Sequence, residues 1–109
     1  MLVYYYVNVP ELPHDVRHQS GSVEIVEYLV EERRLLDVGT PLVRVQNWWA
    51  RLEFDSIGPG MFSKAFFPPG ALVRIGDPYA IITCDPEARP RTPATCTVRI
   101  IERLRVKPG

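Results

Sequence analysis

Two adjacent tryptophans, Trp48 and Trp49, stand at the centre of the segment LVRVQNWWARLEF, between two runs with the composition of β-strands. This pattern indicates a hairpin with two or three turn residues, a place where small or polar side chains are usual. An indole offers neither a nucleophile nor a metal ligand, so its chemistry is apolar and aromatic contact. Consecutive residues point to opposite faces, so at most one ring can readily pack inward. The other ring would expose a large apolar surface, which marks a contact site.

The alternative for the two tryptophans is structural, with one or both indoles folding back to cap the end of the sheets. The neighbouring Gln46, Asn47 and Arg51 would suit a polar rim around an exposed contact. We therefore take Asn47, Trp48, Trp49 and Arg51 as the candidate partner-binding residues.

Other reactive side chains give weaker signals. His14, Asp15 and His18 are close in sequence, but three candidate ligands without a fourth favour a solvated loop over a metal site. Cys84 and Cys96 lack CxxC spacing, and we expect two free thiols rather than a disulfide or a zinc site. The sequence has no glycine-rich phosphate loop and no nucleophile motif. It predicts a non-enzymatic protein with no catalytic residue, cofactor or metal.

Length and charge limit the functional classes further. A chain of 109 residues suits one small domain. Its 13 basic and 13 acidic side chains cancel, which gives no support to nucleic acid or an anionic membrane as the partner. The first residues lack the basic and apolar regions of a signal peptide, and no run approaches the roughly 20 apolar residues of a membrane span. We expect a soluble, cytoplasmic protein.

Strand-like runs bounded by Gly, Pro or Asp fill most of the chain. In the first run, Tyr4 to Tyr6 should form a strand with alternate rings buried. Residues 27–38 could be read as a helix, but their β-branched neighbours and the turn signal at 39–41 favour short strands. Many short strands punctuated by eleven prolines predict an all-β sandwich or flattened barrel. The expected runs cover residues 2–9, 22–30, 40–46, 50–54, 61–67, 71–75 and 79–84.

A weak internal repeat suggests how the strands are organised. Residues 35–45 match residues 72–82 at a constant offset of 37, with Gly39 falling on Gly76. Two copies of one β-unit joined by the Trp-Trp hairpin would form a pseudo-twofold sandwich. The sequence predicts one domain over residues 1–84, followed at 85–109 by a Pro-rich connection and a final strand or a short basic tail.

The segment from Val9 to Ile82 resembles the lipoyl/biotinyl attachment-domain family, with the lipoyl domains of 2-oxoacid dehydrogenase acyltransferases closest. The resemblance is carried by the order and spacing of VPELP, GSVEIVEYLV, DVGTPLVRV, GPG and RIGDPYAII. It implies a lipoyl-like flattened β-barrel or sandwich with a pseudo-twofold repeat. An extra N-terminal strand and a C-terminal strand or tail would be additions to it.

Two positions depart from that family. Its hairpin tip carries the lysine that a ligase modifies, and here Trp49 occupies the corresponding position, so the resemblance implies a degenerate member without the cofactor arm. Lys64, in an expected strand, and Lys107, near the C-terminus, do not replace that lysine. Arg33 stands where the family usually has a turn glycine, whereas Gly70 in the second half is retained. Because a positive φ disfavours arginine, we expect the first turn to have a different shape.

Three functional hypotheses follow. The first is an unmodified adaptor that binds a protein partner through the hairpin tip, which could also serve self-association. The second is an accessory or carrier subunit of an acyl- or carboxyl-transfer complex. The third is kinship with the lipoyl-like half-domains of membrane-fusion adaptors, against which the missing signal peptide and helical hairpin argue.

Overall fold

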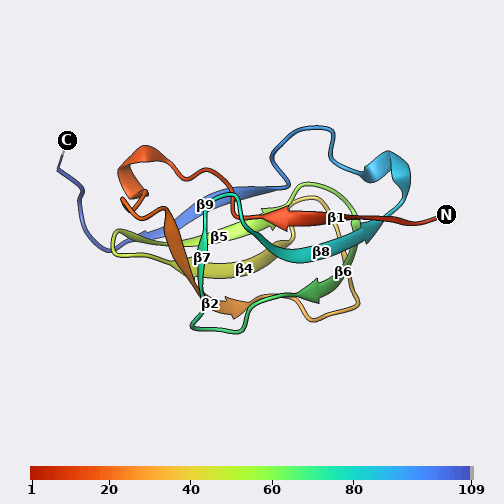
Figure 1. Ribbon diagram of the computed structural model, residues 1–109, viewed down its shortest axis with the longest axis horizontal. Coiled ribbons are helices and arrows are strands. Elements are labelled where there is room, and N and C mark those ends of the chain that lie inside the picture. The colour runs from red at the N-terminus through yellow and green to blue at the C-terminus, as the bar shows by residue number, and fades with distance from the viewer. Residues whose placement is uncertain (109) are drawn as a thin grey trace.

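The computed structural model describes residues 1–108; Gly109, the last residue of the expected segment 85–109, lies outside the described residues. Within residues 1–108, nine strands form two antiparallel sheets whose inner faces share one core (Figure 1). The all-β class is confirmed, and the two sheets are compatible with the expected sandwich. Short 3-10 turns, η1 (His14–Val16) and η2 (Pro86–Ala88), follow β1 and β8.

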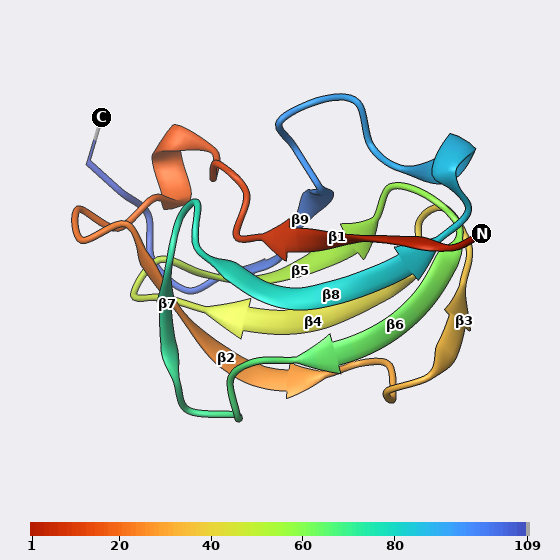
Figure 2. The ribbon, with the colours of Figure 1, turned by 45° about the vertical axis from the view of Figure 1, so that its right-hand side comes forward.

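Each sheet has a simple order of strands (Figure 2). The four-stranded sheet contains, in order, β1 (Val3–Asn8), β8 (Pro78–Cys84), β6 (Gly60–Ala65) and β3 (Arg34–Leu36). The five-stranded sheet contains, in order, β7 (Leu72–Arg74), β2 (Ser22–Tyr28), β4 (Pro41–Gln46), β5 (Ala50–Ser56) and β9 (Cys96–Arg103). Residues 27–38 therefore contain the end of β2, a turn and the short strand β3 rather than a helix, and the C-terminal region contains a strand.

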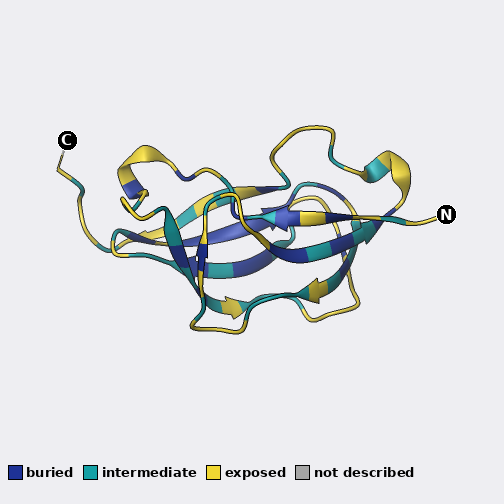
Figure 3. Ribbon diagram, viewed as in Figure 1, coloured by how far each residue is buried: buried dark blue, intermediate teal, exposed yellow. Residues whose placement is uncertain are grey.

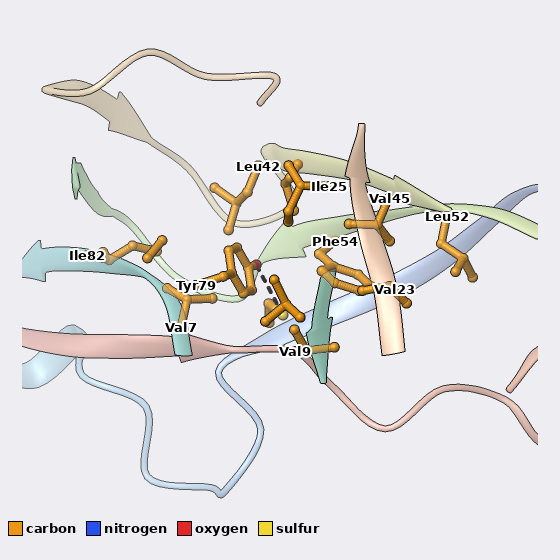
Figure 4. Packing of buried hydrophobic residues seen from close by; sticks show 14 of the residues in the cluster. Val7, Val9, Val23, Ile25, Leu42, Val45, Leu52, Phe54, Tyr79 and Ile82 are labelled. Carbon is orange, nitrogen blue, oxygen red and sulfur yellow. Dashed lines mark hydrogen bonds between the residues drawn. The ribbon is translucent and has the colours of Figure 1, made fainter. Parts of the chain in front are cut away.

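Alternating side chains build the core between the sheets. In β1, Tyr5 is 6% exposed, whereas Tyr4 and Tyr6 are 55% and 48% exposed, which confirms the predicted alternation. Figure 4 shows side chains of both sheets pointing toward one another, and the rings of Phe54 and Tyr79 lie 5.9 Å apart between centroids. Figure 3 shows that the buried residues lie mainly on the strands and the exposed ones in the connections. Burial of these apolar side chains supplies most of the folding free energy.

Backbone pairing recurs along the chain at an offset of 37 residues. The bond from Leu29 N to Leu42 O is 2.9 Å long, and so is the bond from Phe66 N to Tyr79 O. Pairing of β2 with β4 and pairing of β6 with β8 each contain one register shift. These shifts occur, also 37 residues apart, between Ile25 and Glu27 and between Phe62 and Lys64.

The turn at Arg33 contradicts the expectation drawn from its sequence. Arg33 has a φ of 73° and therefore adopts the left-handed conformation, as Gly70 does with a φ of 93°. Arg33 N donates to Phe62 O over 2.6 Å, and Gly70 N donates to Ile25 O over 2.7 Å. The expected difference in shape between these turns is thus wrong, because the same hydrogen bond fixes both. Arginine accepts the conformation at a cost on the order of 1 kcal/mol.

Candidate functional site

Asn47 builds the turn between β4 and β5 that carries the two tryptophans. Asn47 N donates to Ala50 O over 3.0 Å, and Asn47 Oδ1 accepts bonds from the N–H groups of Trp49 and Ala50 at 2.8 and 3.0 Å. Asn47 Nδ2 also donates to Val16 O over 2.7 Å, which ties the hairpin to η1. The predicted hairpin is confirmed. The amide of Asn47 is used within the chain, and it makes the turn rigid.

The two indoles lie in different environments. Trp48 is 56% exposed at the turn, whereas Trp49 is half-buried and packs against the hydrophobic core. Trp49 therefore caps the end of the core, and Trp48 presents apolar surface to the outside. Capping thus describes Trp49, and the exposed apolar surface that was expected of the other ring is found at Trp48.

The C-terminal segment reaches the same turn. Strand β9 runs antiparallel to β5 and ends beside the hairpin (Figure 1). Leu104 N then donates to Trp49 O over 2.7 Å. The guanidinium carbon of Arg105 lies 3.4 Å from the centroid of the Trp48 ring, and Arg105 Nη1 donates to Trp48 O over 2.7 Å. Such a cation–π contact contributes about 0.5–1 kcal/mol at an exposed site.

Lys107 joins the tail to the loop that contains η1. Its Nζ donates to His14 O over 3.1 Å and to Arg17 O over 2.9 Å, and lies 5.9 Å from the centroid of the Trp49 ring. In the same loop, Asp15 forms an ion pair with Arg103. We define the tip as the turn 47–49, the η1 loop 14–18 and the tail 104–107.

The three residues considered as metal ligands, His14, Asp15 and His18, have separate contacts in the structure. Asp15 is held by Arg103, and His18 Nδ1 shares a hydrogen bond of 2.8 Å with Ser20 Oγ. His14 offers its backbone carbonyl to Lys107. The three side chains thus serve different local contacts, and the loop containing them supports the tip.

A groove of about 520 Å³ runs along one side of the tip. Its apolar lining comes from Trp48, Leu72 and Leu104, and its polar lining includes Glu24 and Arg105. Exposed apolar surface with a few polar groups is the usual composition of a recognition site.

The charges of the tip are predominantly positive. Arg51 pairs with Glu102 over 2.9 Å, and Arg17 pairs with Glu11 over 3.1 Å. By contrast, the contacts described above for Arg105 and Lys107 are to backbone carbonyls and an indole, which do not neutralise their charges. The sequence alone did not place Arg105 or Lys107 at the hairpin, because only the pairing of β9 with β5 brings the tail there.

Charged side chains form a separate ladder across the outer face of the five-stranded sheet. Glu27 pairs with Arg44, Arg44 with Glu53, and Glu53 with Arg99, each on a neighbouring strand. Arg99 also binds Asp55, and these hydrogen-bonded carboxylates raise the pKa of Arg99 above its usual range. Glu53 and Asp55 are buried beneath the arginines. This ladder fixes β9 to the sheet and lies outside the candidate site.

The cysteines are free and buried. Burial raises the pKa of Cys96 to about 12 and also raises the pKa of Cys84. Tyr79 Oη donates to Cys96 Sγ over 3.6 Å, and Cys96 Sγ donates to Asn8 O over 3.4 Å. Because the thiolate is the nucleophilic form, both thiols are packing groups at neutral pH.

No protein-family model matches the chain, and no curated protein matches it. Within residues 1–108, no helix has the length and apolar character needed to cross a membrane.

Proposed function

We propose that this chain is a non-enzymatic, lipoyl-like domain that binds a protein partner through its tip. The observation that carries the proposal is the position of Trp48, which is exposed on a turn that Asn47 and the tail hold rigid. A rigid aromatic anchor binds at low entropic cost, and tryptophan is enriched among the residues that dominate binding energies. Arg105 and Lys107 would supply the polar rim.

The recurring backbone bonds support the lipoyl-like part of this proposal. Shifting residue numbers by 37 relates β2, β3 and β4 to β6, β7 and β8, at roughly equivalent bounds. Exchanging these matched strands turns the run β8-β6-β3 of one sheet into the run β4-β2-β7 of the other. Strand β1 lies beside β8 as β5 lies beside β4, and β9 is added beyond β5. A pseudo-twofold unit over residues 1–84 would account for this correspondence. In such a unit Trp49 takes the place of the attachment lysine, which is why we propose an unmodified protein.

Capture of partners from the lysate of the native host tests the function. The variant Trp48→Ala removes the exposed anchor and leaves the core cap Trp49 in place. A matched control is Val38→Ala, which removes an exposed apolar side chain from the connection between β3 and β4. We expect Trp48→Ala to weaken capture of a specific protein at least about tenfold, as truncation of an interface anchor does. Equal capture by the wild type and both folded variants would refute the role of the tip.

The second hypothesis, a carrier or accessory subunit of an acyl- or carboxyl-transfer complex, has one observation in its favour. Lys64 is exposed on β6 and is thus accessible to modification, whereas Lys107 is held by the η1 loop. Intact mass of the protein from its native source separates the two proposals. An adduct on Lys64 would support the carrier, and the unmodified mass would contradict a covalent carrier role.

A further inference from the structure

The outer faces of the two sheets have opposite character. The five-stranded sheet carries the charged ladder of Glu27, Arg44, Glu53 and Arg99. On the four-stranded sheet, the register aligns Tyr4 with Thr83, Thr83 with Met61, and Met61 with Leu35. This second row spans all four strands and consists of uncharged side chains.

The ends of the uncharged row are the most accessible. Tyr4 on β1 is 55% exposed and Leu35 on β3 is 79% exposed. Next to this row, Tyr6 is aligned with Ile81. The ring of Tyr6 packs edge-on against Tyr4 at 5.9 Å between centroids, and it lies 6.1 Å from the ring of Phe66. The exposed rings therefore form one continuous aromatic surface along β1.

The polar groups within this face bind one another. Ser63 Oγ and Thr83 Oγ1 share a hydrogen bond of 2.6 Å between β6 and β8. A hydroxyl that is buried without a hydrogen-bond partner costs free energy. Because these two hydroxyls bond to each other, covering the face costs less. The adjacent row, Tyr6–Ile81–Lys64, ends in the exposed and charged Lys64 at the margin of the face.

We propose that two copies of this chain associate through the outer faces of their four-stranded sheets. A twofold interface brings the same surface of both copies together, so it must be self-complementary. The uncharged row from Tyr4 to Leu35 meets this condition because it places no like charges opposite each other, whereas the charged ladder does not suit such contact. The interface lies on a sheet face and leaves both tips free, so it is independent of the proposed function.

The face is smaller than the interface of a tightly bound dimer, so we expect a dimer of moderate affinity. Four strands spaced by about 4.8 Å, of which β1, β8 and β6 are six or seven residues long and β3 is three, give a projected area of roughly 350 Å². Its accessible area is larger, because the rings of Tyr4 and Tyr6 and the side chain of Leu35 stand out from the sheet. A stable dimer buries about 600–1,000 Å² on each partner. Two such faces would pack about 10 Å apart, as sheets in sandwiches do.

Sedimentation equilibrium of the full chain between about 1 and 300 μM tests this proposal, since that range brackets moderate affinities. We expect the wild type to approach twice the monomer mass as its concentration rises. The variant Tyr4→Glu/Leu35→Glu places charges at both ends of the uncharged row and should raise the dimer dissociation constant at least tenfold. Two controls should keep the dimer: Leu72→Glu, which alters an exposed leucine of the other sheet, and Trp48→Ala.

Circular dichroism must first show that each variant is folded, which the exposure of the substituted side chains favours. A monomer at every concentration would overturn the proposal. The uncharged face would then have to bind a protein other than a second copy of this chain. Dimerisation that survives Tyr4→Glu/Leu35→Glu would also overturn it. Loss of the dimer in Trp48→Ala alone would place self-association at the tip instead.

Discussion

At Arg33 a side chain occupies a backbone conformation that suits glycine, with a φ of 73°. The corresponding Gly70 adopts a similar φ and makes the equivalent hydrogen bond. Because the bond uses only backbone atoms, glycine at position 33 would keep it and would lose the steric strain. Its greater freedom in the unfolded chain offsets part of this gain.

We therefore expect Arg33→Gly to raise the free energy of unfolding by about 0.5–1 kcal/mol. Urea denaturation measures this change, and Gly70→Ala is the matched control. Since alanine would be strained at the φ of 93° there, Gly70→Ala should lower stability by about 1 kcal/mol. A loss of stability in Arg33→Gly would show that its side chain, rather than its backbone, holds the turn.

Buried thiol and phenol groups make stability depend on alkaline pH. Burial raises the pKa of Cys96 to about 12 from an ordinary value of 9.0, and that of Tyr5 to about 12 from 10.0. A raised pKa in the fold means that folding favours the protonated form. The resulting stabilisation is complete below about pH 9 and is lost as the pH rises from about 9 toward 12.

We expect urea denaturation to show stability falling by about 1 kcal/mol or more between pH 9 and 10, because one pKa unit corresponds to about 1.4 kcal/mol. Cys96→Ala should be less stable at pH 8, where it loses packing, but should show a smaller decline over this interval. An identical decline in wild type and variant would assign the effect to other groups.

At the scale of elements, the tail and the hairpin form one unit. Arg105 lies over Trp48, and removing its guanidinium should uncover more of the ring. In a Trp49→Phe background, Trp48 is the remaining tryptophan and reports on this contact alone. We expect Arg105→Gln to increase acrylamide quenching of its fluorescence by less than about twofold, since Trp48 is already 56% exposed with Arg105 in place.

The control for this measurement is Arg91→Gln, which removes an exposed arginine from the connection between β8 and β9. It should leave the quenching unchanged. Unchanged quenching in Arg105→Gln as well would mean that the tail does not cover the indole in solution.

The charged ladder makes β9 part of the five-stranded sheet. Glu53 is buried and accepts bonds from both Arg44 and Arg99, whereas Glu27 at the end of the ladder is about half exposed. We expect Glu53→Gln to lower the free energy of unfolding by about 1–3 kcal/mol, because it weakens two charge-assisted bonds at a buried position. Glu27→Gln, the matched control, should cost less than about 1 kcal/mol, as exposed ion pairs do. Equal costs in denaturation experiments would show that burial of Glu53 does not matter.

At the scale of the whole molecule, local patterns explain what the sequence could predict. Strand positions, the alternation of Tyr4 to Tyr6 and the hairpin around Trp48 depend on neighbouring residues and were correctly predicted. Contacts that depend on strand register were not found, because register joins residues far apart in the chain. The charged ladder and the placement of Arg105 over Trp48 belong to this class.

Arg33 shows a third situation, in which a local rule gave the wrong expectation. Its left-handed conformation is imposed by a hydrogen bond to Phe62 on a neighbouring strand. Tertiary pairing here outweighs a steric preference on the order of 1 kcal/mol.

The measurement that tests the proposed tip function most directly is photo-cross-linking from position 48 in the native host. A photoreactive phenylalanine analogue at position 48 reports what lies against the exposed tip, and the same analogue at position 38 is the control on an exposed apolar site elsewhere. We expect a discrete cross-linked protein from position 48 that is absent from position 38. The same products from both positions, or none from position 48, would contradict binding through the tip.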